Sequence, residues 1–229
     1  MRADGTGALR PERAAPSLRP LLEAVGDVDA FTLSHHRIPP PEGGRRAAVL
    51  MLLADDEHHG PDVLLVERAG TLRDHAGQVA FPGGGADPGD ADAVATALRE
   101  AEEETGLDPE GVAPLALLPE LYIPPSGFVV TPVLAQWERP SAVHAVDAGE
   151  TAAVVRVPLA VLADPANRIR VGHPSGYTGP GFLVAGLLVW GFTGGLLSAL
   201  LDLGGWARPW EPSRVLDLDE AWLRARAEA

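Results

Sequence analysis

Apolar positions in this chain fall into short runs separated by turn-forming residues, a pattern that predicts a series of β-strands. One longer segment instead repeats its apolar positions every three or four residues, as an amphipathic helix does. The runs that predict strands are residues 47–54, 63–67, 78–81, 115–122, 129–138, 154–157, 168–171 and 182–184. Because strands precede and follow the helix, the pattern indicates a protein of the α/β class.

The segment 94–105 is the most clearly periodic helix. Its buried stripe is predicted to consist of Val94, Ala97, Leu98, Ala101 and Thr105. Either Asp90 or Asp92 can cap its first turn, since a carboxylate there accepts a free backbone N–H. Gly106 suits the left-handed conformation in which many helices end. The sequence therefore marks both ends of this helix.

The last turns of this helix hold Glu100, Glu102, Glu103 and Glu104. Helical geometry places Glu100, Glu103 and Glu104 on one arc beside the buried stripe, while Glu102 points elsewhere. Like charges at this spacing repel, and carboxylates oppose the helix dipole at its C-terminal end. A bound Mg²⁺ or Mn²⁺ offsets both effects, and a solvated acidic helix end is the alternative. Arg99 lies four residues before Glu103 and can orient it.

Residues 99–107 resemble the core of the Nudix box, which reads Arg-Glu-apolar-any-Glu-Glu-any-Gly-apolar. Gly85 lies where the box begins, but its first Glu falls on Ala91, with Asp90 adjacent and Asp87 close by. Further segments resemble the coenzyme A diphosphatase branch of the Nudix family: residues 63–68, 72–84, 126–132 and 190–193. The resemblance implies an α/β/α sandwich around a mixed β-sheet.

The resemblance also implies a metal site on the acidic helix. Glu100, Glu103 and Glu104 are the implied metal ligands, together with the backbone carbonyl of Gly85. Arg99 is implied to hold the catalytic Glu103 in place. The implied reaction is attack of water on one phosphorus of a diphosphate, assisted by divalent metal ions.

In many Nudix enzymes a glutamate from a later loop supplies a general base or an extra metal ligand. Glu150, just before the strand 154–157, is the candidate here, and Glu120 is a weaker one. The branch usually has a second acidic residue three positions further on, where this chain has Ala153. A solvated loop glutamate is the alternative interpretation of Glu150.

Candidate substrate contacts precede the box. Arg68, Arg73 and His75 could contact the diphosphate or the 3′-phosphate of coenzyme A, since a forked guanidinium matches phosphate geometry. The alternative is solvated arginines and a histidine bonded to the backbone. The further candidate substrate-binding residues are Gly83, Gly84 and Ser126.

The expected function is hydrolysis of coenzyme A, or of a derivative, to 3′,5′-ADP and 4′-phosphopantetheine or its acyl form. Another diphosphate substrate, such as NADH or ADP-ribose, is the first alternative. A catalytically quiet nucleotide-binding domain is the second alternative, which Ala91 and Ala153 leave open.

Composition narrows the partners. The formal net charge of −14 argues against nucleic acid, whose phosphates require a basic face. The chain contains neither cysteine nor lysine, so a cationic contact to substrate must come from arginine, histidine or a backbone amide. A cytoplasmic location without membrane attachment is expected, and the sequence leaves a homodimer open.

The chain is expected to hold one main domain, over residues 34–205. Residues 1–33 are expected to form a tail with a short helix at 21–28, without the apolar run of a signal peptide. Residues 206–229 are expected to be peripheral, with a last helix at 218–227. The uncharged run 182–201 is long enough to span a membrane, but its four glycines and acidic flank favour a strand followed by a core helix at 187–203.

Overall fold

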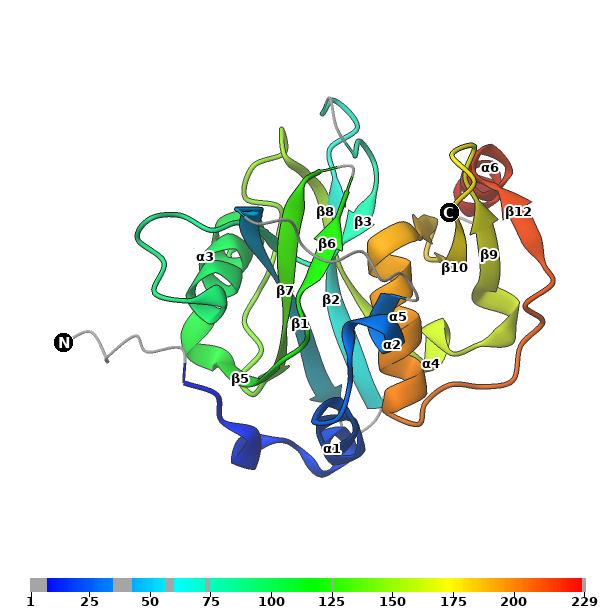
Figure 1. Ribbon diagram of the computed structural model, residues 1–229. Helices are drawn as coiled ribbons and strands as arrows, with labels where there is room; N and C mark the ends of the chain where they lie inside the picture. The colour runs from blue at the N-terminus through cyan, green and yellow to red at the C-terminus, as the bar shows by residue number, and fades with distance from the viewer. Residues whose placement is uncertain (1–7, 35–42, 57–59, 73–74, 125, 228–229) are drawn as a thin grey trace.

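The computed structural model describes residues 8–34, 43–56, 60–72, 75–124 and 126–227. These residues form an eight-stranded and a four-stranded β-sheet with helices between and outside them (Figure 1). The larger sheet consists of β1 (Arg45–Asp56), β2 (Gly60–Arg68), β3 (Val79–Ala80), β4 (Gly83–Gly85), β5 (Val112–Leu117), β6 (Leu121–Ile123), β7 (Phe128–Trp137) and β8 (Thr151–Pro158).

The larger sheet is mixed, as expected. Its strand order is β3-β2-β1-β7-β5, with β4 paired to β1, β6 to β7 and β8 to β2. The long strands β1 and β7 run parallel, whereas the other pairs are antiparallel. Side chains alternate between the two sides along each strand, and consecutive residues of the long strands are apolar. Both faces of the sheet are therefore apolar.

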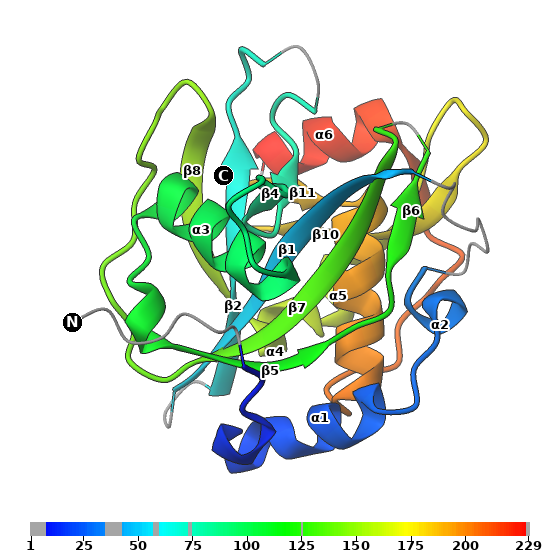
Figure 2. The ribbon, with the colours of Figure 1, turned by 60° about the vertical axis from the view of Figure 1, so that its left-hand side comes forward.

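Helix α3 (Ala93–Thr105) covers one face of the larger sheet, and its predicted position is confirmed. Ala97 and Ala101 are fully buried against Leu50 and Leu52 of β1. The opposite face packs on α1 (Arg19–Val25), α2 (Ala30–Ser34) and α5 (Gly191–Leu203) (Figure 2). The α/β class and the helix-covered mixed sheet are therefore confirmed.

A second sheet was not expected from the sequence. It contains β9 (Arg168–Gly172), β10 (Thr178–Val184), β11 (Leu187–Val189) and β12 (Val215–Asp217), in the order β11-β10-β9-β12. Its inner face shares the core of α5, and α6 (Leu218–Ala227) covers its outer face. The layers are therefore α3, large sheet, α5, small sheet and α6.

The expected core helix 187–203 is wrong in its first turn. Residues Leu187–Val189 form a strand, and the helix begins only at Gly191. Ala185 and Gly186 both have positive φ angles, 51° and 79°, as the tightest hairpin turns require. That turn pairs Val184 directly with Leu187. A hairpin within an uncharged apolar run therefore looks like helix in the sequence.

Both ends of the chain also differ from the expectation. Within the segment expected to be a tail, Ala14, Leu18 and Leu21 are buried in the main core. In the segment expected to be peripheral, β12 adds a strand to the small sheet. The chain after residue 206 is thus part of the packed structure. Shorter helical segments are α4 (Leu159–Leu162) and 3-10 turns at Pro11–Arg13, Pro16–Leu18, Pro109–Gly111 and Pro165–Asn167.

Two predicted strands are divided in the structure. The run 115–122 is split into β5 and β6 around Pro119, which has no N–H to donate to a neighbouring strand. The run 78–81 is shorter, as β3, and β4 follows it. No helix in the described part of the chain combines the length and the apolar character that crossing a membrane requires.

Candidate functional site

The acidic helix α3 is fixed at both ends by its own sequence. The Asp92 side chain accepts a hydrogen bond from Ala95 N at 2.9 Å, and so Asp92 is the N-cap. Gly106 adopts the left-handed conformation, with φ 67°, and ends the helix. Asp90, the other candidate cap, lies outside the helix and has different partners.

Arg99 is the centre of the hydrogen-bond network on this helix. Its Nε and Nη2 donate to the two carboxylate oxygens of Asp90, both at 3.0 Å. Its Nη1 donates to Glu100 at 3.0 Å and to Glu103 at 2.9 Å. Its Nη2 also donates to the carbonyl of Gly85 at 3.0 Å. The expected contact between Arg99 and Glu103 is therefore present.

Asp90 is the residue whose role the sequence reasoning missed. It also accepts hydrogen bonds from the Thr96 hydroxyl and the Asp87 N–H, both at 2.9 Å. The forked contact from Arg99, which outweighs the effect of burial, lowers the pKa of Asp90 to about 2. The available signal was its position beside Ala91, where the box has its first glutamate. Asp90 therefore pairs with Arg99 from the position next to Ala91.

Among the carboxylates of the helix, Glu104 has the pKa that is raised most. Burial raises its pKa to about 7, even though Gly83 N donates to it at 3.0 Å. The charges of Glu100 and Glu150 raise this pKa further, and the charge of Arg68 lowers it. These four charged side chains, contributed by α3, by the end of β2 and by the turn before β8, are therefore close enough to interact.

The glycines of β4 allow the close approach of helix and strand. A Cβ atom on Gly84 would lie 2.5 Å from the carboxyl carbon of Glu100. A Cβ atom on Gly83 would lie 2.3 Å from the carbonyl oxygen of Ala48 in β1. Gly83 and Gly84, proposed from the sequence as substrate-binding, therefore lie directly beneath the acidic helix.

The structure does not gather the four expected metal ligands into one set. Among the described residues, no three Asp, Glu or His side chains converge closely enough to hold a metal ion. Arg99 lies among three of the expected ligands, donating to the Gly85 carbonyl, to Glu100 and to Glu103. The Glu103 side chain is 58% exposed, whereas that of Glu100 is 19% exposed. Glu100 and Glu104 are the expected ligands that lie together.

The candidate substrate contacts Arg68, His75 and Ser126 have different surroundings in the structure. The Nε atom of Arg68 is buried without a hydrogen-bond partner among the described residues. His75 is exposed, has a φ of 59°, and its Nδ1 lies 2.9 Å from Gln78 Oε1. The Ser126 hydroxyl donates to the carbonyl of Ile123 at 3.2 Å and so shapes the β6–β7 turn. Arg73 lies outside the described residues.

The two glutamates proposed as a base also differ. Glu150 lies in an exposed turn, and its carbonyl accepts a hydrogen bond from Ala69 N at 2.8 Å, which ties this turn to the end of β2. Glu120 instead forms an ion pair with Arg46. The charge of Glu150 contributes to the raised pKa of Glu104, so Glu150 lies within electrostatic reach of the acidic helix.

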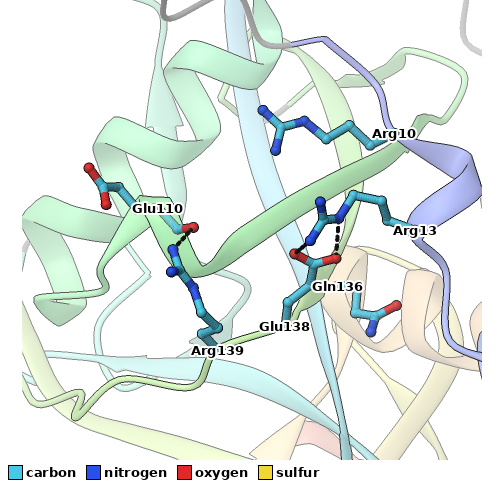
Figure 3. Close-up of a pocket in the computed structure, with 6 residues that line it drawn as sticks. All are labelled: Arg10, Arg13, Glu110, Gln136, Glu138 and Arg139. Atoms are coloured by element: carbon cyan, nitrogen blue, oxygen red, sulfur yellow. Dashed lines mark hydrogen bonds and ion pairs between the residues drawn. The ribbon is translucent and has the colours of Figure 1, made fainter. Parts of the chain in front are cut away.

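A separate polar pocket lies beside the N-terminal segment, where three arginines meet two glutamates (Figure 3). Arg13 forms a forked ion pair with Glu138, and Arg139 donates to the backbone carbonyl of Glu110. None of its lining residues belongs to the acidic helix, so we assign it no part in the chemistry of that helix.

Comparison with known proteins identifies relatives. The family model described as NUDIX domain matches residues 44–174, more than half of the chain. A protein of Cronobacter sakazakii named "Uncharacterized Nudix hydrolase NudL" is 49% identical over 100 residues, which are 44% of this chain and 51% of that protein. A Klebsiella pneumoniae protein of the same name is 39% identical over 159 residues, 65% of this chain and 78% of that protein.

The chain spans about half the length of the first of these curated relatives. Among solved structures, the crystal structure of the M. smegmatis Nudix hydrolase RenU is similar, with a TM-score of 0.48 and 21% identity. That similarity covers 70% of this chain and 86% of the other.

Proposed function

This chain belongs to the Nudix family, and on that premise we propose that it is a divalent-metal-dependent hydrolase of a nucleoside diphosphate derivative. The observation that carries the proposal is the half-buried carboxylate of Glu104, beside the charges of Glu100 and Glu150. Placing like charges together in a partly buried site is unfavourable for folding, and such arrangements concentrate at functional sites.

The donor atoms fit a hard divalent cation. Glu100 and Glu104 supply carboxylate oxygens, the ligands that Mg²⁺ and Mn²⁺ prefer. Burial raises the pKa of both groups, so a cation would relieve an unfavourable interaction that the protein alone retains. We therefore assign the metal to these two carboxylates. Arg99 donates to Glu103 and to the Gly85 carbonyl, and both groups keep free lone pairs with which they can join the metal site.

The residues around the metal would perform distinct parts of the reaction. When bound, the metal polarises the phosphate oxygens and lowers the pKa of the attacking water. Arg99 keeps Glu100 and Glu103 in fixed positions. We assign the general base to Glu150, since its charge acts on Glu104 and it would accept a proton from the attacking water. Arg68 offers guanidinium donors to the diphosphate, and its unpaired Nε supports that role.

Coenzyme A or an acyl derivative is the substrate we propose within this class. The support is local: the segment that resembles the coenzyme A diphosphatase branch forms β2, β3 and β4 beside the acidic helix. The names of the curated relatives give a class of enzyme without a substrate.

The experiment is a product analysis with purified protein, Mg²⁺ or Mn²⁺, and coenzyme A, dephospho-coenzyme A, NADH and ADP-ribose as substrates. Metal-dependent release of 3′,5′-ADP from coenzyme A is the expected result. Cleavage of NADH or ADP-ribose alone would keep the chemistry and replace the substrate. If neither metal supports cleavage of any member, the enzyme proposal is wrong and a nucleotide-binding domain takes its place.

A further inference from the structure

A cleft of about 210 Å³ lies between β6, the start of β10 and the first turns of α5. Tyr122 and Ile123 of β6 form one wall, and Tyr177, just before β10, and Phe192 of α5 also line it. The described residues that line the cleft are all uncharged. Figure 2 shows β6 on the side of the large sheet nearest α2, whose Leu33 also reaches the cleft.

One glycine of α5 lines this cleft although no close packing contact requires glycine there. At Gly194 a Cβ atom would lie 2.6 Å from the carbonyl oxygen of Pro180, so packing against β10 requires glycine there. At Gly195 a Cβ atom would meet only the carbonyl oxygen of Leu33, at 3.9 Å. Glycine inside a helix costs about 0.5–1 kcal/mol relative to alanine. The glycine at position 195 is therefore unfavourable for the helix and leaves the cleft open.

Paired strands of the large sheet connect the cleft to the candidate active site. Gly85 of β4, Ala47 of β1, Val130 of β7 and Leu121 of β6 lie side by side in register. Three strand spacings separate Gly85 from Leu121, about 14 Å. A chain of roughly a dozen bonded atoms in extended form spans that distance.

Phe128 connects the two ends of this path. A Cβ atom on Gly85 would lie 3.7 Å from its ring, so the ring reaches the strand beneath the acidic helix. Phe128 also pairs in register with Ile123, which lines the cleft. The guanidinium of Arg45 stacks over the same ring, 4.2 Å from its centroid. Phe128, with the Arg45 guanidinium stacked on it, therefore lies between β4 and the cleft.

We propose that this cleft binds the uncharged, extended arm of the diphosphate substrate, with the arm crossing Phe128 on its way from the acidic helix. The inference rests on the proposed function and adds a specificity-determining position, Gly195. At about 210 Å³ the cleft is smaller than the roughly 300–1,000 Å³ of pockets that enclose a whole ligand, so it fits one arm and not a nucleotide. Its uncharged lining favours an amide, thioester or hydrocarbon chain over a phosphate.

The test compares wild type with Gly195→Leu, which fills the cleft, and Gly195→Ala, which adds one methyl group. Both variants should fold at least as stably as wild type, because they replace a glycine within a helix. Binding of coenzyme A and of ADP-ribose is measured by calorimetry with a chelator present, and kcat/KM is measured with Mg²⁺. Coenzyme A carries a long uncharged arm, and ADP-ribose carries none.

Gly195→Leu should weaken coenzyme A binding and lower its kcat/KM by at least about tenfold, with Gly195→Ala between it and wild type. The values for ADP-ribose should change less than about twofold. Equal effects on both ligands, or no effect on either, would overturn the inference. A change of stability or of oligomeric state without a change in coenzyme A binding would also overturn it, and would assign the cleft to a protein segment or to a second copy of the chain. If wild type binds coenzyme A but does not cleave it, and Gly195→Leu weakens that binding alone, only the proposed function is overturned.

Discussion

A single arginine organises the acidic helix. Arg99 contacts Asp90, Glu100, Glu103 and the Gly85 carbonyl at once, and so links the glycine strand, the loop after it and the helix. Within that network the Asp90 side chain is only 8% exposed, whereas that of Glu103 is 58% exposed. Hydrogen bonds between charged groups gain strength as solvent is excluded. The contact with Asp90 should therefore stabilise the network most.

Replacing Asp90 tests that ranking. The contact with Arg99 lowers the pKa of Asp90 from 3.8 to about 2 in the folded protein. Its contribution is therefore complete above about pH 4 and is lost as the pH falls towards 2. Asp90→Asn should lower the free energy of unfolding at pH 7 by about 1–2 kcal/mol, after allowance for solvent screening. Denaturant unfolding at several pH values measures the difference.

The matched control is Asp87→Asn, since Asp87 is exposed and contacts Asp90 through its backbone. It should change the free energy of unfolding by less than about 0.5 kcal/mol. If the two variants lose the same stability, or if the loss in Asp90→Asn persists at pH 2, the assigned role of Asp90 is wrong.

Among the elements, β4 and α3 depend on each other. The strand is only three residues long and consists of Gly83–Gly85, and the Glu100 carboxylate lies directly on Gly84. A larger residue at Gly84 has to displace that carboxylate, the flexible end of a side chain, while the backbone stays in place. A larger residue at position 84 should therefore lower the rate of catalysis more than the free energy of unfolding.

Gly84→Ala and Gly85→Ala form a matched pair for this prediction. The new Cβ atom would lie 2.5 Å from the Glu100 carboxyl carbon at position 84, but 3.7 Å from the nearest atom, on the Phe128 ring, at position 85. Gly84→Ala should lower kcat/KM at least about tenfold with less than about 1 kcal/mol of stability lost, and Gly85→Ala should remain close to wild type. Kinetics and thermal unfolding of both variants provide the comparison, and similar activity in the two would contradict it.

Elements that are periodic in sequence were predictable, and those defined by a turn were not. The stripe through Ala97 and Ala101 located α3 because burial imposes the helical period on the sequence. The run 182–201 held no comparable signal, since its strands are buried on both faces and read like helix. The hairpin at Ala185–Gly186 depends on backbone conformation, which a one-letter pattern does not reveal.

The candidate site was predictable to a similar degree. The positions of Glu100 and Glu104 follow from helical spacing, as does the contact of Arg99 with Glu103. The pairing of Arg99 with Asp90 joins residues nine apart across a loop, and its geometry could not be derived from the pattern. For the same reason the hydrogen bond from Arg99 to the Gly85 carbonyl was not expected.

For the whole molecule, the layers outside the large sheet are as integral as the sheet itself. Helix α6 buries Ala221 and Ala225 against Ile169, Val171 and Leu183 of the small sheet. Trp222 of the same helix lies near Gly77, where a Cβ atom would be 3.7 Å from its ring. The end of the chain thus supports the loop between β2 and β3.

Ala221→Glu should therefore destabilise the protein severely, by about 3 kcal/mol or more, because it places an unpaired charge in an apolar interface. Leu223→Glu is the control on the same helix, where the side chain is 70% exposed, and it should be close to neutral. Thermal unfolding distinguishes the two. Equal melting temperatures would show that α6 is peripheral after all.

The central claim is that Glu104 is held in an unfavourable state that a divalent cation relieves. Its pKa is raised from 4.5 to about 7, so the metal-free protein should lose stability as the pH rises through that interval. Glu104→Gln removes the charge and should stabilise the metal-free protein at pH 8, on the order of 1–3 kcal/mol. Glu102→Gln, at an exposed position of the same helix, is the control.

The most direct measurement is thermal unfolding of wild type, Glu104→Gln and Glu102→Gln at pH 8, with a chelator and then with Mn²⁺. We predict that Glu104→Gln melts above wild type in the chelator, and that Mn²⁺ raises the melting temperature of wild type and Glu102→Gln but not of Glu104→Gln. An equal response of all three proteins to Mn²⁺, or no response in wild type, would contradict the assignment of the metal to this helix.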